Sequence, residues 1–76
     1  MKDKIIQIIS DIMETSINED SNKNNSENWD SLNHVKLIVE LQDIFEIKIP
    51  AEDIDKLLSV KDIIKYIEKK LIEKHD

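Results

Sequence analysis

The stretch of the sequence richest in reactive side chains is Asp30-Ser31-Leu32, with His34 three positions after the serine. Serine, histidine and a carboxylate are the components of a hydrolytic triad, and residues three or four apart share one helix face. Catalysis would also need an oxyanion hole, a carboxylate that orients the imidazole and a substrate cleft. A chain of 76 residues without glycine leaves little room for these parts. We therefore predict no enzymatic activity and no catalytic residue.

The asparagine-rich segment before this tripeptide partly matches a calcium-binding loop. Asp20, Asn22 and Asn24 stand at the first, third and fifth positions of an EF-hand pattern. The pattern then fails, because Asn25 replaces the glycine of the sharp turn and Ser31 replaces the bidentate glutamate. The two histidines and the lack of cysteine also leave no transition-metal constellation. No dedicated metal site is predicted, although weak cation binding stays open.

Charge and composition limit the partners. The net charge is −6, and residues 11–55 hold twelve Asp or Glu against three Lys, which favours basic partners. All eleven basic residues are lysines, which lack the forked guanidinium, so no nucleic-acid binding is expected. Charged residues interrupt every apolar run, so we predict no secretory signal and no membrane span. The lack of cysteine is compatible with a reducing cytosol, and with no signal or span predicted we expect a cytoplasmic location.

Apolar periodicity predicts an all-α fold, a small antiparallel bundle of three main helices plus one short helix, forming a single domain over residues 1–76. The helices are expected at about residues 2–15, 31–46, 51–57 and 60–73, with a long loop at about 17–30. Ser59, with Asp62 three positions later, resembles a capping box for the last helix. Because glycine is absent, Asn18 and Asn28 are expected to supply left-handed backbone.

The second predicted helix has apolar residues on two opposite sides. One side can face a core and consists of Leu37, Ile38, Leu41, Ile44 and Phe45. His34 lies toward that side. Leu32, Val35 and Val39, here called the apolar strip, lie opposite among polar side chains that include Lys36. An apolar strip rimmed by charge is typical of a partner-binding surface, although single exposed aliphatic side chains are also common.

Ser31 has two interpretations that do not compete. Serine is a favoured N-cap, and Asp30 beside it complements the positive end of a helix. A helix N-terminus also presents amide donors and positive potential, so a phosphate ester on Ser31 would lie in a favourable field. Trp29 could contact a partner or act as a hydrophobic staple that packs the loop onto the start of this helix, and we favour the staple.

With its serine at a helix start after a long loop, Asp30-Ser31-Leu32 resembles the attachment site of acyl carrier proteins and the related peptidyl carrier domains. The segments "VKLIVELQDIFEIKIP" and "SVKDIIKYIEKKL" are similar to that family's second and last helices, so the resemblance covers residues 4–72. It implies that a phosphopantetheinyl transferase joins 4'-phosphopantetheine from coenzyme A to Ser31. The thiol of this cofactor would hold acyl or aminoacyl groups as thioesters. Asp30 would help the transferase recognise the site.

The resemblance also implies partner enzymes. Leu32, Val35, Lys36 and Val39 stand on the part of the helix that touches partners in the family. These partners would be an acyl- or aminoacyl-activating ligase and downstream acyl-transferring enzymes. We expect the carrier to be a monomer.

Departures from the fatty-acid pattern bear on the pathway. Fatty-acid carriers usually have leucine, glycine and any residue before Asp-Ser-Leu, where this chain has Glu27, Asn28 and Trp29. Asn33 and Lys36 stand where those carriers commonly have acids. We therefore favour a specialised biosynthetic pathway over housekeeping fatty-acid synthesis. The alternative from another class is an unmodified helical adaptor that binds a protein through the apolar strip.

Overall fold

The computed structural model describes residues 1–74, and residues 75 and 76 lie outside the described part. The described residues form four helices, α1 (Lys2–Met13), α2 (Ser31–Phe45), α3 (Ala51–Ile54) and α4 (Val60–Lys74). This confirms the predicted all-α fold with three main helices and one short helix. Within residues 1–74, every helix is too short or too polar to span a membrane.

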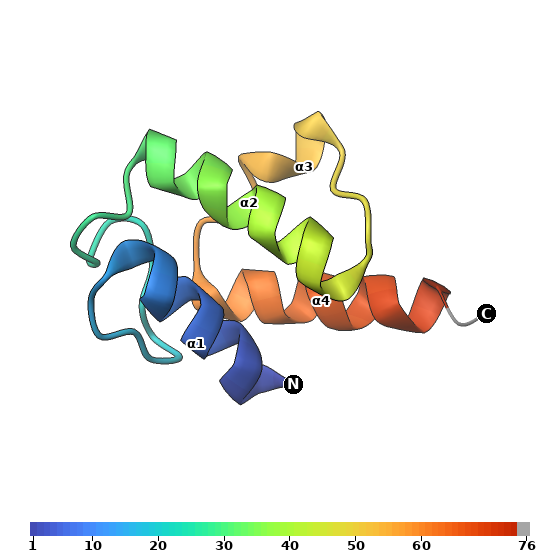
Figure 1. Ribbon diagram of the computed structural model, residues 1–76, viewed down its shortest axis with the longest axis horizontal. Coiled ribbons are helices and arrows are strands. Elements are labelled where there is room, and N and C mark those ends of the chain that lie inside the picture. The colour runs from blue at the N-terminus through green and yellow to red at the C-terminus, as the bar shows by residue number, and fades with distance from the viewer. Residues whose placement is uncertain (75–76) are drawn as a thin grey trace.

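The three long helices enclose one apolar core. In Figure 1, α3 lies above α2, and α4 lies below α2. Helix α1 packs against both α2 and α4. The fully buried side chains come from all three long helices and are Ile5, Ile9, Met13, Leu37, Ile38, Leu41, Val60, Ile63 and Ile67. Burying each such side chain contributes about 1.5–3 kcal/mol, so this core is the main source of stability. Ile44, predicted to face the core, is instead 36% exposed.

Two helices end at glutamates with left-handed backbone. Glu14 has φ 53°, so α1 ends at Met13 and not at residue 15 as expected. Glu46 also has φ 53°, and its backbone N–H donates to the Gln42 carbonyl, which closes the last turn of α2. The left-handed conformation is unfavourable for residues other than glycine, so both helix ends are strained.

The two asparagines expected to be left-handed behave differently. Asn28 has φ 66°, as predicted, whereas Asn18 is not among the positive-φ residues of the described chain. The Asn18 side chain instead accepts a hydrogen bond of 2.8 Å from the Asp20 backbone N–H. Such an Asx turn reverses the chain without a left-handed residue, which explains why the prediction for Asn18 is wrong.

Helix α3 is shorter than the predicted range 51–57, because it ends at Ile54. Beyond it, the Lys56 N–H donates to the Asp53 carbonyl at 3.1 Å and the Leu57 N–H donates to the Ile54 carbonyl at 3.3 Å. These bonds join residues three apart, as in a tight turn, so the α-helical pattern does not continue. No side chain of the four-residue helix is fully buried.

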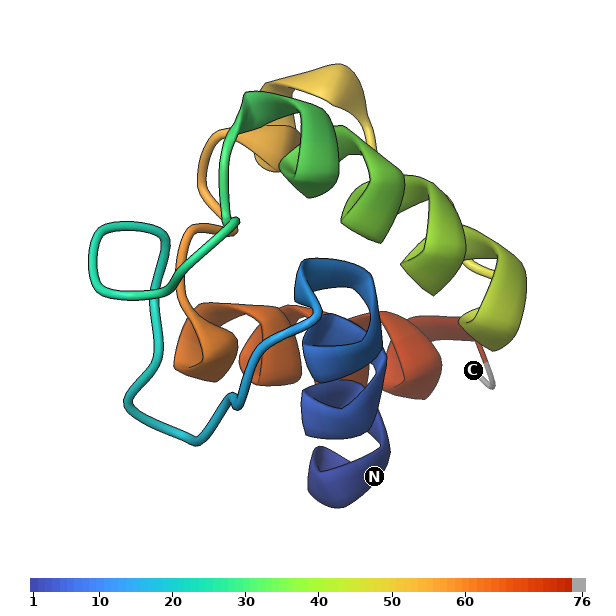
Figure 2. The ribbon, with the colours of Figure 1, turned by 60° about the vertical axis from the view of Figure 1, so that its left-hand side comes forward.

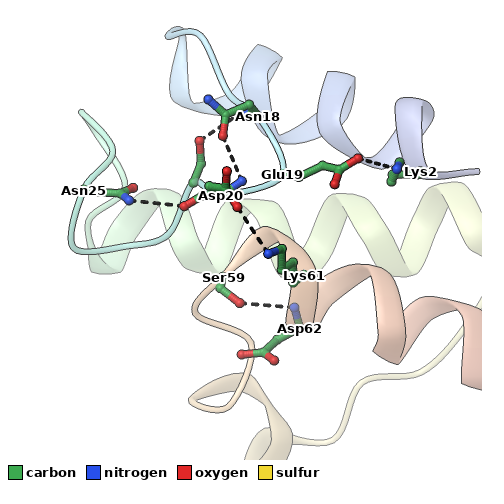
Figure 3. Close-up of polar contacts among 9 residues, drawn as sticks. Lys2, Asn18, Glu19, Asp20, Asn25, Ser59, Lys61 and Asp62 are labelled. Atoms are coloured by element: carbon green, nitrogen blue, oxygen red, sulfur yellow. Dashed lines mark hydrogen bonds and ion pairs between the residues drawn. The ribbon is translucent and has the colours of Figure 1, made fainter.

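The first loop, residues 14–30, is fixed to the rest of the fold and lies at the end away from the last turn of α4 (Figure 2). The Lys23 N–H donates to the Leu58 carbonyl at 2.8 Å, and the Val60 N–H donates to the Ser21 carbonyl at 3.0 Å. Salt bridges also hold the loop, one joining Lys2 to Glu19 and another joining Lys61 to Asp20 at 3.2 Å (Figure 3).

The start of α4 and the suspected calcium segment use their polar side chains locally. The Asp62 N–H donates to Ser59 Oγ at 3.1 Å, which confirms Ser59 as the cap of α4 (Figure 3). Asn22 Oδ1 accepts from the backbone N–H groups of Asn24 and Asn25 at 2.8 and 3.1 Å. Within residues 1–74, no group of three or more His, Asp or Glu side chains is arranged to hold a metal ion.

Candidate functional site

Helix α2 is capped by Asp30 and not by Ser31. Asp30 has extended backbone, and its Oδ1 accepts a hydrogen bond of 2.9 Å from the Asn33 N–H. A carboxylate accepts more strongly than a hydroxyl and is favoured by the positive helix end, so Asp30 takes the cap position. Ser31 becomes the first residue of the helix, and its side chain is exposed. The prediction that Ser31 is the N-cap is therefore wrong, and its hydroxyl is left out of the cap.

Asn28 shapes the turn that leads into this site. It stands where the fatty-acid motif has glycine, and its φ of 66° is the left-handed conformation that asparagine tolerates better than most residues. Its side-chain amide donates to the Met13 carbonyl at 2.8 Å, which ties the loop to the end of α1. Its own carbonyl accepts from the Asn33 side chain at 2.8 Å. Asparagine therefore supplies left-handed backbone at the position where the fatty-acid motif has glycine.

Trp29 and His34, which flank Ser31 in the sequence, pack together in the interior. Trp29 is 3% exposed and His34 is 4% exposed. Their ring centroids are 6.3 Å apart, and Trp29 Nε1 donates to His34 Nδ1 at 3.0 Å. Trp29 precedes the cap and His34 is the fourth helical residue, which are the two positions of a hydrophobic staple. The staple and the inward position of His34 are thus confirmed.

His34 has no free ring nitrogen for catalysis. Its Nδ1 accepts from Trp29, and its Nε2 lies 2.9 Å from the Ile54 carbonyl oxygen, to which it donates. An imidazole engaged on both sides cannot also take a proton from a serine. This contact with α3 could not be read from the sequence, because it joins residues twenty positions apart.

The apolar strip on α2 is exposed as predicted. Leu32 is 67% exposed, Val35 54% and Val39 51%. An open recess of about 410 Å³ is lined by Ile12, Val35, Lys36, Val39 and Glu40. The sequence did not predict that Ile12 of α1 lines this surface, because its apolar periodicity places it with the core residues of that helix. The surface beside Ser31 therefore extends across two helices.

The residues around Ser31 fit a phosphopantetheine group. The exposed serine stands on the first turn of a fifteen-residue helix, where the helix dipole favours a phosphodiester anion. Asp30 and the strongly exposed Leu32 flank it without covering it. When bound, the group supplies a thiol that forms thioesters.

Comparison with known proteins agrees with this site. The chain matches the family model described as phosphopantetheine attachment site over residues 3–67. It is 39% identical over 75 residues to an acyl carrier protein of Chlorobium phaeovibrioides, covering 92% of this chain and 94% of that protein. It is 33% identical over 70 residues to an acyl carrier protein of Syntrophus aciditrophicus, covering 88% of each.

A solved structure shows the same fold. The solution NMR structure of a holo acyl carrier protein from Geobacter metallireducens has a TM-score of 0.83 and 29% sequence identity, covering 96% of this chain and 87% of that chain. Fold and sequence together define a phosphopantetheine carrier. The chain belongs to the acyl carrier protein family. Its cofactor is covalently attached 4'-phosphopantetheine, and members of the family are carriers and not enzymes.

Proposed function

We propose that Ser31 is the residue that receives 4'-phosphopantetheine, and that Asp30 and Leu32 complete the surface recognised by the modifying enzyme. The observation that carries this proposal is the exposed serine at the first position of α2, directly after the capping aspartate. Ser31 needs no base within the chain, because a phosphopantetheinyl transferase activates its hydroxyl. The single apolar core supports the treatment of residues 1–76 as one carrier domain.

In this proposal the carrier is a monomer that presents acyl or aminoacyl thioesters to successive enzymes. The apolar strip and Lys36 contact an activating ligase and downstream acyl-transferring enzymes. More than half of the surface of each strip residue is exposed, so these side chains can be buried by a partner without unfolding the helix. Tethering raises the local concentration of the intermediate at each active site.

The pathway is proposed to be a specialised one in the cytoplasm. Lys36 and Asn33 stand at two positions of this helix where fatty-acid carriers commonly have acids. Lys36 also lines the recess beside Val35 and Val39. A cation in this position repels the basic partner surfaces that recognise an acidic helix. The runner-up is a housekeeping carrier of fatty-acid synthesis.

Intact-protein mass spectrometry tests the proposal. The wild-type protein and Ser31→Ala are incubated with coenzyme A and a broad-specificity phosphopantetheinyl transferase. The expected result is a gain of one phosphopantetheine in the wild type and none in Ser31→Ala. An unmodified adaptor would show no mass gain in either protein. An equal mass gain in both proteins would show that the cofactor is attached to a residue other than Ser31.

A further inference from the structure

A chain of two hydrogen bonds links the segment around Ser31 to α3. Trp29 Nε1 carries a hydrogen and can only donate, so His34 Nδ1 must accept across the 3.0 Å between them. The Ile54 carbonyl can only accept, so His34 Nε2 must donate across 2.9 Å. Both bonds therefore require one neutral tautomer of His34, with its hydrogen on Nε2.

The hydrogen bond from Trp29 to His34 spans Ser31 in the sequence. Trp29 lies two residues before Ser31 and His34 three residues after it, and both are buried while Ser31 is exposed. Three other bonds also span Ser31. The Asn33 N–H donates to Asp30 Oδ1, the Asn33 side-chain amide donates to the Asn28 carbonyl, and the His34 N–H donates to the Asp30 carbonyl at 2.8 Å. These three bonds stay within the segment, whereas the imidazole reaches a different helix.

Helix α3 is short and has few polar contacts with the long helices. None of its four side chains is fully buried, although Ile54 is half-buried and packs against the apolar core. Within residues 1–74, two hydrogen bonds from side chains of the long helices reach α3. They are the bond from His34 to the Ile54 carbonyl and the bond of 2.8 Å from Tyr66 OH to Asp53 Oδ2.

We propose that His34 is a positioning residue, whose neutral imidazole holds the Ser31 segment through Trp29 and couples it to α3 through Ile54. The part of the proposal that concerns modification rests on Ser31 as the attachment residue. A movement of α3 that breaks the bond to Ile54 leaves the imidazole free to turn, and the bond to Trp29 is lost with it. The presentation of Ser31 to the transferase then depends on the position of α3.

Three variants of His34 separate the two bonds. His34→Leu removes both while keeping an apolar side chain in the buried site. His34→Asn places an amide oxygen near the position of Nδ1 and can accept from Trp29. His34→Gln places an amide nitrogen near the position of Nε2 and can donate to the Ile54 carbonyl. Tyr66→Phe is the matched control, because it removes the other side-chain bond of α3 without touching His34.

The first readout is NMR of the unmodified proteins. Trp29 is the only tryptophan, so its indole N–H gives a single resonance. In His34→Leu this resonance should move upfield and exchange faster with water, and the amide resonances of residues 51–54 should shift. His34→Asn should restore the indole resonance, and His34→Gln should restore those of α3. Unchanged indole and α3 resonances in His34→Leu would overturn the proposal.

The second readout is kcat/KM for phosphopantetheine transfer. We expect a fall of about tenfold in His34→Leu, the factor that corresponds to one lost buried hydrogen bond. His34→Asn should recover most of the rate, and Tyr66→Phe, which keeps both bonds of His34, should lose less of the rate than His34→Leu. Equal rates in His34→Leu and wild type, or a rate in His34→Asn as low as that in His34→Leu, would contradict the proposal. If His34→Leu loses its helical circular dichroism, the transfer rate is measured for Trp29→Phe instead, because this variant removes the donor of the same hydrogen bond.

The two proposals fail in different ways. If the wild-type protein gains no phosphopantetheine, attachment at Ser31 fails, but the indole and α3 resonances still decide whether His34 couples the two segments. If the wild type is modified while the resonances do not respond to the variants, only the role of His34 fails.

Discussion

The Tyr66 hydroxyl of α4 donates a hydrogen bond of 2.8 Å to Asp53 Oδ2 of α3. Burial of the phenol, this hydrogen bond and the charge of Asp53 raise the pKa of Tyr66 above its ordinary value. Because the folded-state pKa exceeds the unfolded value, the neutral phenol contributes stability that is fully present below about pH 10. That contribution is lost as the pH rises through the folded-state pKa.

Alkaline titration of tyrosinate absorbance checks this contact directly, because Tyr66 is the only tyrosine in the chain. The folded protein should titrate at higher pH than the same chain in denaturant. Asp53→Asn should lower the pKa of Tyr66 but not restore the unfolded value, because burial remains. Identical titration curves for the folded and denatured chains would show that the phenol is free.

Glycine at the end of α1 should stabilise the protein. Glu14 is exposed and has φ 53°, a conformation that costs glutamate more than glycine. Glu14→Gly should raise the free energy of unfolding by about 0.5–1 kcal/mol, measured by urea denaturation. Glu68→Gly is the matched control, since the same change inside α4 should lower it by about 1 kcal/mol. A destabilised Glu14→Gly would refute the strain at this helix end.

Val35 tests the role of the apolar strip. Val35→Asp should slow enzyme-dependent loading of the phosphopantetheine arm by about tenfold, because a charge replaces an apolar side chain of the proposed partner surface. Helical circular dichroism should change little, since Val35 is 54% exposed. Ile72→Asp makes the same kind of change at an exposed site on α4. Loading at the wild-type rate in Val35→Asp would remove the strip from the partner surface.

Lys36 tests the pathway. An acyl-transferring enzyme of fatty-acid synthesis should act on the loaded wild-type carrier slowly, and Lys36→Glu should increase kcat/KM by several-fold at low salt. Lys65→Glu changes the charge equally on α4 and should have little effect. If the wild type already reacts as fast as a fatty-acid carrier, the housekeeping assignment replaces the specialised one.

Much of the fold followed from local sequence signals. The repeat of isoleucines in α1 and α4 and the polar loop between α1 and α2 were enough to predict the all-α bundle. The cap of α4 and the staple of Trp29 on His34 were also predictable, because each depends on residues only three to five positions apart. The spacing of residues close together in the sequence is therefore enough to predict these features.

The features that could not be predicted depend on competition or on distant contacts. Ser31 and Asp30 are both good caps, and only the backbone shows that the carboxylate takes the position. The glutamates that end α1 and α2 carry no sequence signal, since glutamate rarely adopts left-handed backbone. The contact of His34 with the Ile54 carbonyl needs the tertiary fold.

Attachment of the cofactor at Ser31 is the central claim, and peptide fragmentation tests it most directly. After transfer from coenzyme A, cleavage at lysine yields a peptide of residues 24–36 that contains both Ser26 and Ser31. Tandem mass spectrometry then separates the two serines. We predict that the fragments with Ser31 but without Ser26 carry the whole phosphopantetheine mass. The same mass on Ser26, or on any other peptide, would contradict the account.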